Sequence, residues 1–261
     1  MTDHYAGTAE GWARSAALVY RPLAHDLVAA APHPLDGRLV LDLGAGTGLV
    51  SSALVAAGAR PIGLDLSLDM LRWRRHERPP AAVARADRIP LRTDAVDDSA
   101  AAFVLNHLPV PVLALRELGR VTRPGGAVLA TVYANSGVSP SRDRVDEVAV
   151  AHGFRWPDWY RTLKEVWAPQ LGTEQAMADA ADAAGLTAVR VVEYAADVGL
   201  DSTEDLVDYR YHQAHCREWI SNLSRDQRDR LRADAIAAVT PIMEPYRPQV
   251  ILLVAAPSSS G

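Results

Sequence analysis

Residues 40–54 read V-L-D-L-G-A-G-T-G-L-V-S-S-A-L. A short apolar run precedes glycines at positions 44, 46 and 48, and an apolar helical pattern begins directly after them. This pattern predicts a buried strand, a tight turn and a helix N-terminus. Because glycine has no Cβ, it can adopt a positive φ and lets the backbone approach a ligand closely. We therefore expect a ligand to be held against this turn.

Composition limits the class of protein. The chain has 261 residues, of which 49% are apolar, enough for one large α/β domain with its own core. A single cysteine, Cys216, rules out a disulfide framework and a thiolate zinc cluster. The net charge of −5 and the lack of basic clusters argue against a nucleic-acid partner. The sequence shows neither a leader pattern nor a membrane-spanning apolar stretch, so we expect a cytoplasmic protein, monomeric or homodimeric.

Strand and helix patterns alternate along the chain, which predicts an α/β fold with a doubly wound, mostly parallel sheet. A helical region over residues 8–30 should be broken at Pro22 into two helices. One continuous helical pattern covers residues 202–223. The expected strands are residues 39–43, 61–64, 81–85, 100–105, 127–133, 187–194 and 249–255. The expected helices between them are residues 47–57, 67–75, 110–121 and 173–184.

We expect a single domain with four parts. Residues 1–35 form an N-terminal helical cap and residues 36–135 a ligand-binding core. Residues 136–247, in which aromatic residues are frequent, hold helical lid insertions and the sixth strand. Residues 248–256 form the last strand.

Polar residues follow the predicted strands at the edge of the sheet where open parallel sheets bind ligands. Asp65 ends the second strand, where a carboxylate can accept hydrogen bonds from ribose hydroxyls. Asp87, beside Arg88, follows the third strand and could accept from a purine amine. Together these residues indicate an adenosine site. Taken alone, Asp65 could equally be a helix-capping carboxylate.

The glycine spacing separates the possible ligands. A phosphate-binding P-loop would end in Gly-Lys-Ser/Thr, whereas this turn continues as Gly48-Leu49-Val50. The dinucleotide fingerprint places its third glycine one position later. Asp42 directly before the turn is a poor neighbour for a pyrophosphate, but a good one for an ammonium or sulfonium centre, directly or through a water.

Four stretches, residues 40–49, 63–71, 84–91 and 103–126, resemble in order and spacing the class I S-adenosylmethionine-dependent methyltransferases of the ubiquinone/menaquinone-methylase group. The resemblance implies S-adenosyl-L-methionine as cofactor and S-adenosyl-L-homocysteine as product. It also implies a seven-stranded sheet whose last strand, residues 249–255, is antiparallel. In this reading Asp65 holds the ribose, Leu66 and Met70 flank the adenine, and Asn106 lies near the sulfonium. The implied cofactor-binding residues are Asp42, Gly44, Ala45, Gly46, Asp65, Leu66, Met70, Asp87, Arg88 and Asn106.

Methyl transfer from a sulfonium is an in-line displacement, so positioning is its main demand and a base is optional. His107, after the fourth strand, is the candidate catalytic base, although it could instead serve only to start a helix. His212, His215 and Cys216 form an H-x-x-H-C run without a fourth ligand at suitable spacing, so we expect no metal site.

Aromatic residues of the N-terminal cap and the lid could close over a substrate or simply form a core. In either case we expect a small, partly apolar organic molecule, such as a specialised metabolite, to be methylated at oxygen or carbon. The alternative is a protein that keeps the cofactor but performs a cyclisation or isomerisation. The candidate pocket residues are Tyr5, Trp12, Tyr133, Trp156, Tyr160, Tyr209 and His212.

Overall fold

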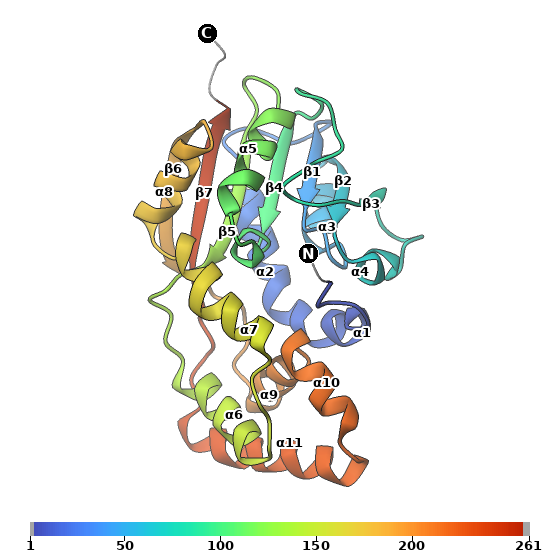
Figure 1. The fold of residues 1–261 in the computed structure, drawn as a ribbon, viewed down its shortest axis with the longest axis vertical. Coiled ribbons are helices and arrows are strands. Elements are labelled where there is room, and N and C mark those ends of the chain that lie inside the picture. Colours follow the sequence, from blue (N-terminus) through green and yellow to red (C-terminus); the bar gives the residue numbers. More distant parts are fainter. Residues whose placement is uncertain (1–2, 258–261) are drawn as a thin grey trace.

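A seven-stranded sheet forms the centre of the computed structural model, which describes residues 3–257 (Figure 1). The strands lie in the order β3-β2-β1-β4-β5-β7-β6, and β7 alone runs antiparallel to its neighbours. The expected doubly wound, mostly parallel sheet with an antiparallel last strand is confirmed. The strands are β1 (Leu39–Leu43), β2 (Arg60–Asp65), β3 (Ala81–Val83), β4 (Asp98–Ala102), β5 (Val128–Tyr133), β6 (Leu186–Ala195) and β7 (Gln249–Pro257).

Strand β4 differs most from its predicted range of residues 100–105. It begins at Asp98 and ends at Ala102, because Phe103 adopts a φ of +54° and the chain then turns into the 3-10 helix η2 (Leu105–His107). Because Asp98 and Ser99 are polar, a search for apolar residues placed the start of the strand two residues too late. The early end of the strand brings Asn106 and His107 to the carboxyl edge of the sheet.

Helices cover both faces of the sheet. On one face, α2 (Ala17–Ala29) and α3 (Leu49–Ala56) bury Leu27 and Leu54. On the other face, α5 (Pro111–Val121) and α8 (Glu174–Ala183) bury Leu118 and Met177. The short helix α4 (Leu68–Arg72) follows β2, and Ser67 caps it by accepting the N–H of Met70 at 3.4 Å.

A helical lid lies beyond the carboxyl ends of the parallel strands (Figure 1). Its helices pack around a second apolar cluster, which includes Phe154, Leu206 and Leu231 and extends to Tyr20 in α2. The predicted single helix over residues 202–223 is wrong, because the chain breaks at His212 and Gln213. The lid helices are α6 (Pro140–Ala151), α7 (Asp158–Thr162), α9 (Thr203–Tyr211), α10 (Ala214–Asn222) and α11 (Arg225–Val239), with the π-helix η3 (Leu163–Trp167) and the 3-10 helices η4 (Ala168–Leu171) and η5 (Thr240–Ile242).

The N-terminal helical region corrects another prediction. Pro22 lies inside the continuous helix α2, and the irregularity falls earlier, where the π-helix η1 (Trp12–Ala16) follows the short helix α1 (Ala9–Gly11). Proline removes the N–H that would bond the carbonyl of Leu18. The side chain of Leu18 is 45% exposed, so this side of the helix faces water, which can hydrate that carbonyl.

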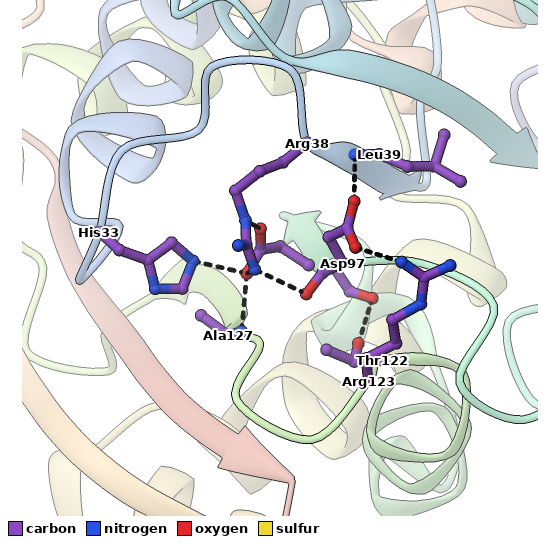
Figure 2. Close-up of polar contacts among 9 residues, drawn as sticks. His33, Arg38, Leu39, Asp97, Thr122, Arg123 and Ala127 are labelled. Atoms are coloured by element: carbon purple, nitrogen blue, oxygen red, sulfur yellow. Dashed lines mark hydrogen bonds and ion pairs between the residues drawn. The ribbon is translucent and has the colours of Figure 1, made fainter.

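A polar network fastens the sheet at the edge opposite the lid (Figure 2). The buried carboxylate of Asp98 accepts from Arg38 Nε at 2.5 Å, from the Ala127 N–H at 2.8 Å and from His33 Nε2 at 2.9 Å. Next to it, Asp97 accepts the N–H of Leu39 at 2.7 Å. These bonds join the beginnings of β1, β4 and β5. This network is structural, since it lies away from the carboxyl edge of the strands.

We expect Asp98→Ala to lower the free energy of unfolding by about 3 kcal/mol, because the change leaves Arg38 and a buried N–H without their acceptor. Urea unfolding followed by circular dichroism measures the loss. Asp97→Ala is the matched control and should cost less, because the Asp97 side chain is 25% exposed and water can replace it. Equal losses in the two variants would contradict the role given to Asp98.

Candidate functional site

The glycine turn joins β1 to α3 in a conformation that requires glycine. Gly44, Gly46 and Gly48 have φ values of +75°, +49° and +95°. A Cβ on Gly44 would lie 2.6 Å from the Cβ of Val104, so this position excludes a side chain for steric reasons as well.

The N–H groups of this turn are used inside the protein. Gly44 and Ala45 donate to the carbonyl of Leu64 at 2.7 and 3.1 Å, and Gly48 donates to the carbonyl of Ala45 at 2.8 Å. Gly46 donates to Asp65 Oδ2 at 2.8 Å. These four N–H groups are therefore not presented to a phosphate, in contrast to a P-loop.

Asp65 fastens the turn to the end of β2. Besides Gly46, it accepts the N–H of Ser67 through Oδ1 at 2.7 Å. Burial raises the pKa of Asp65, and the two backbone N–H groups partly offset this. Each carboxylate oxygen accepts one bond here and has a further lone pair. Asp65 is therefore not the cap of α4, which is Ser67, and it retains the capacity to accept from a ribose.

Asp42 is fully buried at the end of β1. Its Oδ2 accepts from Ser51 Oγ at 2.6 Å, whereas Oδ1 has no hydrogen-bond partner among residues 3–257. Burial raises the pKa of Asp42 to about 6, although the bond from Ser51 and the charge of Arg78 act in the opposite direction. A buried oxygen without a partner is costly, so this atom is suited to a water or a polar ligand group.

Arg78 is a residue of the site that the sequence reasoning missed. Its Nη1 donates to the carbonyl of Gly46 at 2.7 Å, and its charge acts on both Asp42 and Asp65. Its Nε and Nη2 are buried without a partner among the described residues. Arg78 therefore supports the turn and supplies the positive charge beside its carboxylates. It lies in a loop with no motif of its own, so no sequence signal identified it.

An N-terminal segment, residues 3–8, covers the turn. Thr8 Oγ1 lies 3.7 Å from Met70 Sδ, and Met70 Cε lies 3.5 Å from the position of a Cβ on Gly46. The N–H of Gly7 donates to Asp69 Oδ2 at 2.9 Å. Met70 thus packs directly beside the turn, while Leu66 is partly buried next to it.

The two residues predicted for the adenine edge lie nearer the surface. Asp87 pairs with Arg85 through bonds of 2.9 and 2.6 Å, and this bonding lowers the pKa of Asp87. Arg88 is exposed. Asn106, in contrast, is buried, and its Oδ1 has no partner among residues 3–257.

A cavity of about 540 Å³ lies between the sheet and the lid. Asn106, His107 and Tyr5 line it on the side of the sheet. Four more of the predicted pocket residues also line it: Tyr133, Trp156, Tyr160 and Tyr209.

Two predicted pocket residues lie elsewhere. Trp12 stacks on Tyr20, with ring centroids 4.8 Å apart, and belongs to the apolar cluster of the lid. His212 is exposed, and its Nδ1 lies 2.7 Å from the carbonyl of Asp208. Neither side chain is part of the cavity wall. The sequence pattern placed both residues on helices but did not show which face of each helix points to the cavity.

His107 contacts Tyr5, and its Nε2 lies 3.4 Å from the Tyr5 hydroxyl. Burial lowers the pKa of His107 to about 4, and the charge of Lys164 adds to the effect. The imidazole is therefore neutral at physiological pH. It can accept a hydrogen bond, but it is a weaker base than an ordinary histidine.

The cavity also has polar walls that the aromatic pattern did not indicate. Arg142 and Asp146 come from α6, Lys164 from η3 and Arg210 from α9. His215 is buried there and stacks on Tyr160, with ring centroids 4.0 Å apart. The aromatic residues of the lid thus share the cavity with charged groups from three different elements.

The H-x-x-H-C run does not assemble a metal site. His212 is exposed, whereas His215 and Cys216 are buried, and burial raises the pKa of the Cys216 thiol to about 12. Within residues 3–257, no group of three or more potential metal ligands is found.

We expect Asp42→Asn to stabilise the protein increasingly as the pH rises. The folded state holds the pKa of Asp42 at about 6 instead of 3.8, so ionisation costs folding free energy. This cost is absent at pH values where both states are protonated and complete where both are ionised. The gain from the variant should therefore grow by about 2 kcal/mol between about pH 4.5 and about pH 8.

Urea unfolding at the two pH values measures this difference. Asp201→Asn, at an exposed position, is the control for the substitution itself. A pH-independent effect of Asp42→Asn would contradict the raised pKa.

Comparison with known proteins is consistent with this geometry. Residues 41–130 match a family described as a methyltransferase domain. Among curated relatives, the demethylmenaquinone methyltransferase of Streptomyces griseus is 35% identical over 117 residues, which is 44% of this chain and 51% of the relative. That of Corynebacterium kroppenstedtii is 36% identical over 101 residues, 39% of this chain and 44% of the relative. The chain thus spans about half the length of these relatives.

Solved structures share the fold at low sequence identity. One chain from the complex of the Haloferax volcanii Trm112 methyltransferase activator with a presumed methyltransferase has a TM-score of 0.61 and 18% identity, and covers 99% of this chain and 98% of its own. Haemonchus contortus phosphoethanolamine N-methyltransferase 2 was solved with S-adenosylhomocysteine and with S-adenosyl-L-methionine. It has a TM-score of 0.58 and 18% identity, and the match covers 91% of this chain and 52% of the neighbour. The cyclase SpnF has a TM-score of 0.59 and 18% identity, and the match covers 91% of this chain and 81% of SpnF.

The matched family, the relatives and the fold agree with the order of motifs around the glycine turn. Residues 41–130 are therefore similar to a methyltransferase domain, and the chain shares its fold with solved methyltransferases.

Proposed function

We propose that this protein transfers the methyl group of S-adenosyl-L-methionine to an oxygen or carbon of a small, partly apolar organic molecule. The observation that supports it most is the aromatic-walled cavity, which reaches Asn106 and His107 at the carboxyl edge of β4. In this proposal, residues 36–135 bind the cofactor and residues 136–247 form the lid over the acceptor.

The residues around the turn fit this cofactor. The free Asp42 Oδ1 suits the ammonium group of its methionine part, directly or through a water. Asp65 can accept from the ribose hydroxyls with its remaining lone pairs. Leu66 and Met70 would flank the adenine, with Asp87 and Arg88 at its edge. The N–H groups of Gly44, Ala45, Gly46 and Gly48 are occupied, which agrees with a ligand that has no phosphate.

The bound cofactor would supply an electrophilic methyl carbon on a sulfonium. The chain's own contribution is to hold the acceptor atom in line with that carbon and to exclude water. Tyr5 and Asn106 line the cavity where this alignment would occur. Aromatic rings such as that of Tyr5 also tolerate the positive charge of a sulfonium nearby.

His107 remains the proposed acceptor of a proton. Its low pKa keeps it neutral above about pH 5, so it can accept a hydrogen bond from a hydroxyl on the methyl acceptor. A weak base is sufficient where the leaving proton is acidic, as in a phenol, or where a carbon acceptor loses its proton after transfer.

The methyl acceptor of the relatives cannot be assigned to this protein directly. Their names specify demethylmenaquinone, but the matched region covers less than half of this chain, and the family match ends at residue 130, before the lid begins. A specialised metabolite stays our proposal for the acceptor.

Location and partners also stay predictions. Within residues 3–257, no helix combines the length and apolarity needed to cross a membrane. A cytoplasmic protein without a nucleic-acid partner remains our expectation, and the sequence leaves its oligomeric state open.

The cyclisation alternative is not favoured. The matched family and the relatives are methyltransferases, and the likeness to SpnF is one of fold at 18% identity. Mass spectrometry separates the two, because methylation adds one methylene unit to the product mass whereas isomerisation leaves it unchanged.

We expect Asp65→Ala to weaken the binding of S-adenosylhomocysteine by about 1–3 kcal/mol, because it removes charge-assisted bonds to the ribose and the clamp on Gly46. Isothermal titration calorimetry measures the affinity. Asp179→Ala, at an exposed position on α8, should bind like the wild type. The proposed function fails if the wild type binds a nicotinamide dinucleotide and no S-adenosylhomocysteine.

A further inference from the structure

The lid side of the cavity is rich in positive charge, although the chain as a whole has a net charge of −5. Two acidic residues, Asp146 and Glu165, belong to the lining. Five basic residues line the same cavity: Arg142, Arg161, Lys164, Arg210 and Arg247. A small, purely apolar acceptor would not require this concentration of cations.

One of these cations is neutralised inside the protein. Arg210 is 8% exposed, and its Nε and Nη2 donate to the two carboxylate oxygens of Asp146 at 2.7 and 2.8 Å. The guanidinium also stands 5.7 Å from the ring centroid of Trp156. Both oxygens of Asp146 are thus bonded to Arg210, and the carboxylate acts on Lys164 only through its charge.

Two cations beside this pair lack a strong partner. Arg142 Nε and Nη2 both point at a single oxygen of Asp143, at 3.3 and 2.9 Å, and the Asp143 side chain is 52% exposed. The side chain of Lys164, the only lysine of the chain, is exposed at the cavity and makes no hydrogen bond or ion pair within residues 3–257. Partial desolvation and repulsion from Arg142 and Arg210 lower the pKa of Lys164, and the charges of Asp146 and Asp143 partly offset this.

Repulsion from Arg142 and Arg210 disfavours the charged form of Lys164, and an anion bound in the cavity would offset this repulsion. Lys164 is also close enough to His107 to lower the pKa of that residue, so its charge is felt near the proposed transfer site. The aromatic rings of Trp156 and Tyr160 line the same cavity. A planar ligand could therefore stack on these rings while its charged end meets Arg142 and Lys164.

We propose that the methyl acceptor carries an anionic group, a carboxylate or a phosphate, which Arg142 and Lys164 bind; this inference rests on the proposed function. The reacting atom then lies toward Asn106 and His107. The buried Nε2 of His215, which has no partner among residues 3–257, offers the acceptor one further hydrogen bond.

This arrangement selects against neutral analogues. A neutral amide in place of the anion would make no charge-assisted bond to Arg142 or Lys164, which line the same cavity. Charge-assisted bonds to the anion are also stronger than neutral ones. The cation pair thus discriminates between acceptors by charge, and the aromatic walls by shape.

The test uses three aromatic probes of similar shape: 4-hydroxybenzoate, phenyl phosphate and the neutral 4-hydroxybenzamide. Binding is followed by tryptophan fluorescence, since Trp156 and Trp159 line the cavity, with and without saturating S-adenosylhomocysteine. The variants are Arg142→Gln and Lys164→Gln. Arg144→Gln is the matched control, because Arg144 lies on the same helix, pairs with Glu147 and is outside the cavity wall.

We expect at least one anionic probe to bind about tenfold or more tightly than the amide, and each cavity variant to lose about tenfold for that anion alone. The preferred probe distinguishes a carboxylate from a phosphate acceptor. The control should bind like the wild type. Thermal melting of each variant verifies folding, and Lys164→Gln keeps the test valid if Arg142→Gln fails to fold.

The proposal is overturned if the amide binds as well as both anions, if no anion binds at millimolar concentration, or if the variants keep wild-type affinity for the preferred anion. A protein that binds S-adenosylhomocysteine but shows no anion preference refutes this inference alone. Absence of S-adenosylhomocysteine binding refutes the proposed function, and the probe titrations without it still decide the charge preference.

Discussion

The site depends on how the glycine turn is clamped to the end of β2. The carbonyl of Leu64 accepts the N–H groups of Gly44 and Ala45, and Asp65 accepts that of Gly46. These bonds fix the turn in a conformation that only glycine tolerates at position 44. They also engage three N–H groups of the turn that a phosphate could otherwise bind. The turn therefore favours a ligand recognised by carboxylates, and the charge of Arg78 acts on both Asp42 and Asp65.

Charge divides the site into two halves. Carboxylates surround the turn, where Asp42 and Asp65 are both disfavoured as anions by burial. Cations line the lid side of the cavity, where Arg142 bonds only the exposed carboxylate of Asp143 and the Lys164 side chain has no ion pair within residues 3–257. A cationic methyl donor would compensate the charge of the carboxylates, and an anionic acceptor that of the cations. The two molecules would then meet at Asn106, which lines the cavity at the carboxyl edge of the sheet.

The sequence was sufficient to predict the order and direction of the strands, but it predicted only part of the cavity lining. Parallel strands must end at one edge, so Asp42, Asp65 and Asn106 could be brought together from strand order alone. Lid contacts depend on helix rotation and packing, which a local pattern does not determine. Trp12 and His212 accordingly turned away from the cavity. The cations of the cavity come from several separate segments of the lid, so no local pattern groups them. The loop residue Arg78 belongs to no motif, so the sequence did not indicate it.

The crystal structure of the complex with S-adenosylhomocysteine tests the central claim most directly. The account predicts ribose hydroxyls on Asp65, the amino group on the Asp42 side of the turn, and the sulfur facing the cavity beside Asn106. The clamp from Leu64 to Gly44 should be unchanged. A ligand bound elsewhere, or one whose sulfur is shut off from the cavity by residues 3–8, would contradict it.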